Sequence, residues 1–315
     1  MDQSISNCCK KILHEELITA LGCTEPIAVA YAAAKAREVL GCLPEHAIIY
    51  CSGNIVKNVK AVAVPNTVDL KGISAAAAVG VAGGNPSLEL EVLRTVDQTA
   101  LETAKEMLAR GVFEERLLDT PAKLHIIAEL SAEGHCAVVE IIHTHTGIVR
   151  IERDGVRLVD VPHAETADEA MDERLTLTLE QIYTFANEVP LEEIEPLLAN
   201  QIACNTAIGR EGLTNDYGAA IGKTLLEMYG REDTRVMAVA MAAAGSDARM
   251  SGCEMPVVIN SGSGNQGITV SVPVYVHAKA MGVNDEKMYR ALCFANLVAI
   301  YQKTRIGRLS AYCGA

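Results

Sequence analysis

The sequence predicts an α+β fold: a discontinuous all-helical domain, residues 1–44 and 164–315, carrying an inserted α/β domain at residues 45–163. The first observation is that apolar residues recur at helical spacing towards both ends of the chain. The second is that β-type runs separated by turn residues occupy the middle. Because the ends of one domain usually lie near each other, we expect the first and last segments to fold together.

The first segment predicts two helices. Residues 7–21 carry apolar side chains at helical spacing, and Gly22 ends this helix. Pro26 suits the first turn of the next helix, over 26–40, because its missing N–H costs nothing there. Thr24 is the expected cap of that helix, which closes at Gly41.

The middle and last segments predict the remaining elements. In the middle we expect two hairpins, and the Asp154-Gly155 pair is the turn signal of the second. The middle elements are a strand at 46–51, helices at 52–59, 72–84 and 87–110, strands at 124–130 and 136–143, and a hairpin at 147–161. The later helices are 165–187, 190–208, 217–229, 232–249 and 284–303, with a loop at 204–212.

Composition narrows the class of protein. A net charge of −13, without a cluster of Lys and Arg, argues against a nucleic-acid partner. The first residues lack the basic and apolar regions of a signal peptide. The sequence contains no run of about 18 apolar residues, so we expect no membrane span. The ten cysteines are scattered rather than densely spaced, which indicates a reduced, cytoplasmic protein. Helices rich in Ala and Met make a homodimer plausible.

The segment Gly22-Cys23-Thr24-Glu25-Pro26 places a thiol, a hydroxyl and a carboxylate on one tight turn. At the start of a helix, the positive end of the helix dipole would lower the pKa of the Cys23 thiol. The alternative is that Cys23 is a small residue that fills a corner between two helices. The local sequence favours neither reading.

A second candidate site is a polar loop between an apolar run and a helix. It contains Asn260-Ser261-Gly262-Ser263-Gly264-Asn265-Gln266-Gly267. Backbone N–H groups and a helix N-terminus in such a loop can bind an anion, and the amides add donors for a carboxylate. Asn54 and Lys57 form a similar polar turn after a strand. The alternatives are a flexible connector for the loop and a solvated side chain for Lys57.

Other chemistries find little support. His143 and His145 would share one face of a strand, but no further ligand stands at the spacing of a zinc site. The chain has no Cys-x-x-Cys pair, no Walker motif, no dinucleotide fingerprint and no Gly-x-Ser-x-Gly nucleophile elbow.

Several ordered segments together resemble the L-cysteine desulfidase family, which shares its fold with the α-region of bacterial iron–sulfur L-serine dehydratases. The resemblance covers essentially the whole chain. It rests on His14-Glu15-Glu16, Gly22-Cys23-Thr24-Glu25-Pro26-Ile27-Ala28, Gly53-Asn54-Ile55, Lys57-Asn58, Val64-Pro65-Asn66-Thr67, Ser261-Gly262-Ser263-Gly264-Asn265-Gln266-Gly267 and Ile306-Gly307-Arg308-Leu309-Ser310-Ala311-Tyr312-Cys313-Gly314.

The resemblance implies a [4Fe–4S] cluster held by three cysteines, with Cys23 and Cys313 as two of them. The family's third cysteine belongs to a motif beyond residue 315, so we expect this chain to be truncated and the cluster to be weakly held or absent. Cys253 or Cys293 could substitute as ligands, although we do not expect it. The implied reaction converts L-cysteine to pyruvate, ammonia and sulfide.

The resemblance also assigns roles to the two candidate sites. Glu25 is one candidate for the base, and Cys23 is the other if it is not a ligand. The expected substrate-binding residues are Thr24, Asn54, Lys57, Asn260, Ser261, Gly262, Gly264, Asn265, Gln266 and Gly267. L-Serine is the alternative substrate. Two other readings stay open: a degenerate member that only binds an amino acid, and an enzyme completed by a second polypeptide.

Overall fold

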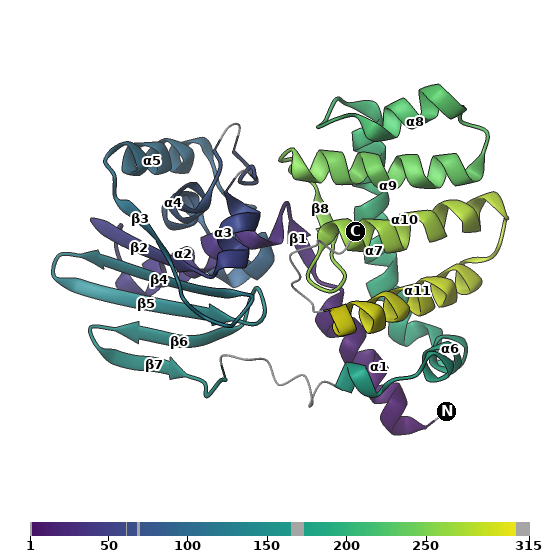
Figure 1. The fold of residues 1–315 in the computed structure, drawn as a ribbon, viewed down its shortest axis with the longest axis horizontal. Coiled ribbons are helices and arrows are strands. Elements are labelled where there is room, and N and C mark those ends of the chain that lie inside the picture. Colours follow the sequence, from purple (N-terminus) through teal and green to yellow (C-terminus); the bar gives the residue numbers. More distant parts are fainter. Residues whose placement is uncertain (1, 61, 68–69, 165–172, 307–315) are drawn as a thin grey trace. The chain divides into compact units, whose positions relative to one another are not determined.

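The computed structural model describes residues 2–60, 62–67, 70–164 and 173–306, and it confirms the α+β fold (Figure 1). The chain divides into a helical unit, residues 1–20 and 169–315, and a sheet unit, residues 21–168. This division differs from the expected boundaries at 44 and 164. Residues 21–44 belong with the sheet because helix α2 (Thr24–Leu40) packs on its strands.

The sheet unit is built on six strands in the order β3-β2-β4-β5-β6-β7. Their bounds are β2 His46–Cys51, β3 Phe113–Leu117, β4 His125–Ala132, β5 His135–Ile142, β6 Ile148–Arg153 and β7 Val156–Asp160. β2 pairs in parallel with β3, and every other neighbouring pair is antiparallel. Both predicted hairpins, β4–β5 and β6–β7, are confirmed, the second with Asp154 and Gly155 at positive φ.

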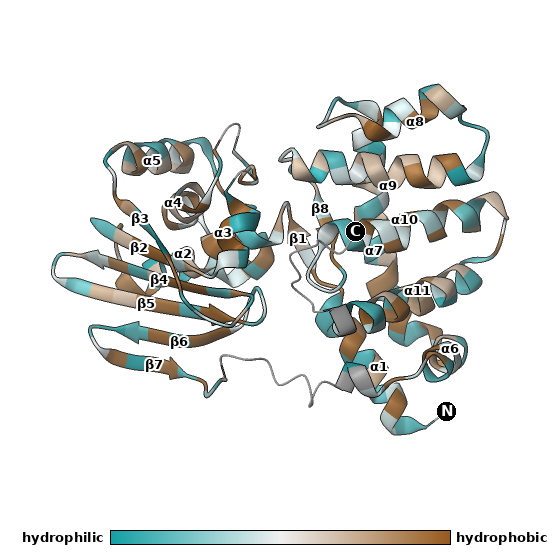
Figure 2. Ribbon diagram, viewed as in Figure 1, coloured by the Kyte–Doolittle hydropathy of each residue, from teal (hydrophilic) through white to brown (hydrophobic). Residues whose placement is uncertain are grey.

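Helices α2, α4 (Ile73–Gly83) and α5 (Gln98–Ala109) form the helical layer of this unit. α2 contacts β4, β5 and β6, and α4 contacts α2 and α5. β4 and β5 are hydrophobic along most of their length (Figure 2). α2 and α4 approach closely because Gly80 has no side chain: a Cβ there would lie 2.3 Å from the carbonyl oxygen of Ala30.

The helix expected over 87–110 is interrupted. A 3-10 helix, η1 (Pro86–Glu91), comes first, and the chain turns before α5 starts. Glu89 has a φ of 47°, which no regular helix accommodates. Asp97 then caps α5 by accepting a bond of 2.8 Å from the Ala100 N–H. The amphipathic pattern was correct for α5 but extended too far towards the N-terminus.

The helical unit surrounds α7 (Leu191–Thr214), which contacts α9 (Thr234–Met250), α10 (Gly264–Ala280) and α11 (Asp285–Ile306). The other elements are α1 Gln3–Glu16, η3 Glu173–Thr176, α6 Leu179–Glu188 and α8 Ile221–Tyr229. Two short strands, β1 (Thr19–Leu21) and β8 (Pro256–Val258), pair with each other. Beyond that pair, the Ile259 N–H donates a bond of 2.9 Å to the carbonyl of Ile18.

Three predictions in the helical unit were wrong in detail. The first helix ends at Glu16 rather than residue 21, because residues 19–21 form β1. The expected loop at 204–212 lies inside α7. In place of the single helix expected at 165–187, the structure has the short helix η3 followed by α6. Residues 165–172 of that prediction lie outside the described part of the chain. Among the helices that the structure describes, none has the length and apolar composition to cross a membrane.

Candidate functional site

The turn Gly22–Pro26 forms the start of α2 in the sheet unit. Cys23 is the N-cap residue with extended backbone angles, and Thr24 is the first helical residue. The prediction that Thr24 caps the helix was therefore wrong by one position, and the Cys23 side chain makes no cap bond. Gly22 has a φ of +66°, and a Cβ there would lie 2.2 Å from Cγ of Pro65. Glycine is thus required both by the turn and by the contact.

The carboxylate of Glu25 gathers three side chains of this turn and its surroundings. The Cys23 thiol donates to Oε2 across 3.2 Å. The Thr24 hydroxyl donates to the same oxygen across 3.0 Å. The Asn58 amide donates to Oε1 across 3.3 Å. Three donors on two oxygens hold the carboxylate in one orientation.

Cys23 and Thr24 are shielded from solvent, whereas the Glu25 carboxylate is partly accessible to a substrate. Cys23 is 7% exposed and Thr24 1% exposed, while Glu25 is half-buried. The positive end of α2 favours negative charge in its first turn, where Glu25 stands. The site therefore presents an oriented carboxylate and a thiol at the start of one helix.

Asn54 and Lys57 lie on α3 (Gly53–Val59), the same short helix as Asn58. Asn54 is half-buried and Lys57 is exposed. From this helix, Asn58 bonds to Glu25. Asn58 was overlooked as a site residue, although it directly follows Lys57 in the polar segment that drew attention to α3.

In the helical unit, the polar loop between β8 and α10 is a tight, ordered turn. The backbones of Asn260 and Ser263 exchange two hydrogen bonds of 3.1 and 3.0 Å. Ser261 and Gly262 between them have φ values of 50° and 76°. A Cβ on Gly267 would lie 2.1 Å from the carbonyl oxygen of Val258. These constraints argue against the flexible-connector alternative.

A network of buried amides continues from this loop into α7 and α11. Asn260 donates to Oδ1 of Asn296 across 2.9 Å, and Asn296 exchanges two bonds with Gln201. Asn260 Oδ1 in turn accepts bonds from Ser261 and Gln266. Asn260 is fully buried, and both ends of its amide are engaged. It acts as a structural centre of the loop, whereas the expectation was that it contacts substrate.

The loop also holds a buried cation, Arg249, that was not predicted from the sequence. Arg249, on α9, is 4% exposed, and its Nη1 donates to Oδ1 of Asn265 across 3.0 Å. Gly264 makes room for it, because a Cβ there would lie 2.2 Å from Nε of Arg249. Gly262 and Gly264 thus shape the loop, and Asn265 links α10 to a guanidinium. The sequence signal for this contact is weak, because it consists only of a glycine in the loop and an arginine in another helix.

Cysteine chemistry decides which residues could hold an iron–sulfur cluster, because the ligand must be a thiolate. Burial raises the pKa of Cys9 and of Cys293 to about 12, and it also raises the pKa of Cys51. Cys293 is fully buried in the hydrophobic core, which speaks against its replacing a ligand. Cys253 is 7% exposed, and it adds to the burial that raises the pKa of the nearby Tyr217.

Cys23 differs from these thiols because it borders a polar turn and a helix N-terminus. Its surroundings fit one cluster ligand. Cys313 lies outside the described residues, and within the described ranges no three His, Cys, Asp or Glu residues group as a metal site. Cys23 itself falls in the sheet unit, whereas the expectation placed it in the helical domain.

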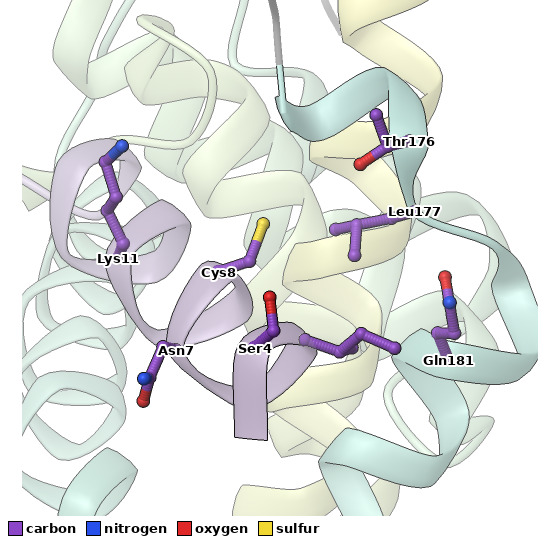
Figure 3. A pocket seen from close by; sticks show the side chains of 8 residues that line it. Ser4, Asn7, Cys8, Lys11, Thr176, Leu177 and Gln181 are labelled. Carbon is purple, nitrogen blue, oxygen red and sulfur yellow. The ribbon is translucent and has the colours of Figure 1, made fainter. Parts of the chain in front are cut away.

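The two histidines considered for zinc do not lie on a strand, because β5 ends at Ile142. His143 has a φ of 66°, and its Nε2 lies 2.7 Å from the carbonyl of Ala164. A cavity of about 530 Å³ lies elsewhere, in the helical unit, where α1 meets η3 and α6 (Figure 3). It is lined by Ser4, Ile5, Asn7, Cys8, Lys11, Thr176, Leu177 and Gln181. None of the predicted site residues lines this cavity.

Comparisons with known proteins agree on one family. A family model described as "Serine dehydratase alpha chain" matches residues 87–315. A UPF0597 protein of Lachnoclostridium phytofermentans is 54% identical over 304 residues, covering 96% of this chain and 72% of that protein. A UPF0597 protein of Treponema denticola is 45% identical over 310 residues, covering 97% and 72% of the two chains. No solved structure matches.

Proposed function

Because this chain belongs to the serine dehydratase alpha chain family, we propose that it is a lyase acting on a small L-amino acid by α,β-elimination. The substrate is L-cysteine, which yields pyruvate, ammonia and sulfide, with L-serine as the second candidate. The observation that supports this most is the Cys23–Glu25 arrangement at the start of α2. It combines a metal-binding thiol with an oriented carboxylate.

The reaction needs a base for the α-proton and help for the β-leaving group. Glu25 is the proposed base: its carboxylate takes the α-proton, and the electron pair left on the α-carbon expels sulfide or hydroxide from the β-carbon. The resulting aminoacrylate tautomerises to an imine, and water hydrolyses the imine to pyruvate and ammonia. Thr24 and Asn58 hold Glu25 in place for this step.

Cys23 and Cys313 are the proposed ligands from this chain for a [4Fe–4S] cluster. When bound, such a cluster supplies a Lewis-acidic iron, and its soft character suits a sulfur leaving group. A thiol that becomes a ligand must lose its proton. Oε2 of Glu25, 3.2 Å from Cys23 Sγ, is the acceptor in place for it. No disulfide joins the described cysteines, which suits a reducing, cytoplasmic compartment.

The amino-acid carboxylate is the proposed ligand of the polar loop at the start of α10. Backbone N–H groups of Gly264 and Asn265 precede the first helical bond, so they are available by geometry to an anion. On α3, Lys57 is the exposed cation that would attract the substrate. Ser261, Gly262 and Gly267 set the shape of the loop rather than its charge.

The test is turnover by the protein after anaerobic reconstitution with iron and sulfide. With two ligands from this chain we expect a weakly held cluster, detected by absorbance at about 400 nm from iron-bound thiolates, and release of pyruvate with L-cysteine and L-serine. Cys23→Ala should lose both the absorbance and the pyruvate. Equal turnover by the wild type and Cys23→Ala after removal of iron would refute the proposal.

A further inference from the structure

Main-chain carbonyls determine which way the buried side-chain amides of Asn260 and Asn296 are oriented. Asn296 Nδ2 donates to the carbonyl of Leu292 across 2.9 Å, so Oδ1 of Asn296 must face the other way. Asn260 Nδ2 donates both to that oxygen and to the carbonyl of Asn296, across 2.9 and 3.3 Å. Because a main-chain carbonyl only accepts, neither Asn260 nor Asn296 can be flipped.

The same logic then fixes Gln266. With its amide nitrogen turned to Asn296, Asn260 presents Oδ1 to the loop, where it accepts from Ser261 across 2.9 Å and from Gln266 across 3.0 Å. Gln266 must therefore direct its nitrogen at Asn260. Within the part of the chain that the structure describes, its carbonyl oxygen, Oε1, is left buried without a hydrogen-bond partner, in a residue that is 5% exposed.

A buried acceptor without a donor is costly, and the cost is removed when a ligand supplies the donor. Gln266 stands in the first turn of α10, beside Gly264 and Asn265. The N–H of Gln266 is bonded to the Ser263 hydroxyl, and that of Gly267 to the Ser263 carbonyl. Gly264 and Asn265 come before these bonds, so their N–H groups point out of the helix end.

We propose that Gln266 Oε1 accepts a hydrogen bond from the α-ammonium group of the amino acid whose carboxylate binds at Gly264 and Asn265. This inference rests on the proposed function and deepens it, because it assigns the residue that selects an amino acid over a plain carboxylic acid. An α-amino acid carries a donor and an anion on one carbon, which matches an acceptor and N–H donors within one helical turn. The match is chemical and needs no particular side chain on the ligand.

The experiment compares two ligands that differ only in the ammonium group: L-alanine and propionate. L-Alanine has no β-leaving group, so it cannot be consumed. Binding to the protein is measured by calorimetry for the wild type and for Gln266→Met, which removes the acceptor and keeps the length of the side chain. Asn260 Oδ1 retains its bond from Ser261 in this variant, so the loop keeps a donor there.

Gln201→Met is the matched control. It makes the same chemical change at the other end of the amide network, where both amide ends of Gln201 are bonded to Asn296. We expect the wild type and Gln201→Met to bind L-alanine about tenfold or more tightly than propionate, as a charged hydrogen bond implies. In Gln266→Met, we expect the two affinities to become equal while propionate binding stays unchanged.

Three outcomes overturn the inference. The first is that the wild type binds L-alanine and propionate equally, as it would if Oε1 bound only a water molecule. The second is that Gln266→Met keeps the preference for L-alanine. The third is that Gln201→Met loses this preference as fully as Gln266→Met does, while its melting temperature is unchanged. Failure of the proposed function looks different. Selective, Gln266-dependent binding of L-alanine without any pyruvate formation would retain the inference and reject the elimination reaction.

Discussion

The amide of Asn58 lies 3.3 Å from Oε1 of Glu25 and ties α3 to the first turn of α2. Thr24 holds the other carboxylate oxygen across 3.0 Å. A base with both oxygens bonded cannot rotate away from the atom that it attacks, which is how positioning contributes to rate. In this account Glu25 touches the substrate, and Asn58 acts through Glu25.

Asn58→Leu should therefore lower kcat by about tenfold and leave KM within about twofold, since positioning affects the reaction step more than binding. Thr24→Val removes one of the two donors on the other oxygen at nearly constant volume and should act in the same direction. Steady-state assays of pyruvate release separate the two constants. A raised KM at unchanged kcat would instead place Asn58 in contact with the substrate.

The close contact of Gly22 in the turn before Cys23 can be tested by substitution, with Gly155 as the matched control. Both have positive φ, but a Cβ on Gly22 would lie 2.2 Å from Pro65 Cγ, while one on Gly155 would have nothing within 4 Å. Gly155→Ala should cost about 1–2 kcal/mol of unfolding free energy from backbone strain alone. Gly22→Ala should cost about 1–3 kcal/mol more because it also overpacks. Urea denaturation measures both, and equal losses would contradict the contact with Pro65.

Glu140 gives the sheet unit a pH dependence. A hydrogen bond from His125, then one from Arg150, lowers the pKa of this buried carboxyl to about 2 from 4.5. A lowered folded-state pKa stabilises the fold above pH 4.5, and the stabilisation disappears as pH falls towards 2. The difference is worth about 3 kcal/mol.

Glu140→Gln should remove this part of the acid sensitivity. Denaturant titrations at pH 7, about 4.5 and about 3 should show the wild type losing stability towards low pH more steeply than the variant. The charged neighbours of Glu140 stay in place in the variant, namely His125, Arg150 and His163. Parallel curves for the two proteins would contradict the assigned pKa of Glu140.

Much of the fold could be predicted because local patterns and packing agree. Strands β4 and β5 have alternating or continuous apolar residues, as expected for a sheet with one covered face. Asp154 and Gly155 provide the positive φ values in the turn of the β6–β7 hairpin. Gly41 ends α2 in the left-handed conformation, as the sequence indicated. Where one residue type serves one local purpose, the prediction was correct.

Prediction failed where a glycine serves packing rather than a turn. Gly209 and Gly212 suggested a loop, but both lie inside α7, where a Cβ on Gly212 would lie 2.0 Å from the carbonyl oxygen of Ala244. The assignment of residues 21–44 failed for a related reason. Whether α2 packs on helices or on strands depends on long-range contacts that its own pattern does not encode.

The candidate site was predicted in part. The sequence drew attention to both polar turns, yet it could not distinguish bonded amides from available ones. Asn260 was expected to contact substrate but has its amide bonded internally, while the side-chain oxygen of Gln266, six residues later, has no hydrogen-bond partner among the described residues. Arg249 was missed because its place in the loop depends on Gly264, a contact between segments 15 residues apart.

Cysteine identity should decide iron binding. Cys293 is fully buried among apolar side chains, and burial raises its pKa to about 12, so Cys293→Ala should leave the bound iron unchanged. Cys23→Ala should lose most of the iron, because it removes a thiolate ligand. Iron per chain, measured after anaerobic reconstitution, gives the comparison. Loss of iron in Cys293→Ala at an unchanged melting temperature would contradict this assignment.

The most direct measurement is pyruvate release from L-cysteine and L-serine by the reconstituted protein and by Glu25→Gln. Glu25→Gln keeps the size of the side chain: its oxygen can still accept from Asn58, and its nitrogen can donate to the Thr24 hydroxyl, but the proposed base is removed. We expect iron to stay bound in the variant while turnover falls by about a hundredfold or more, because a general base is lost. Undiminished pyruvate release by Glu25→Gln would contradict it.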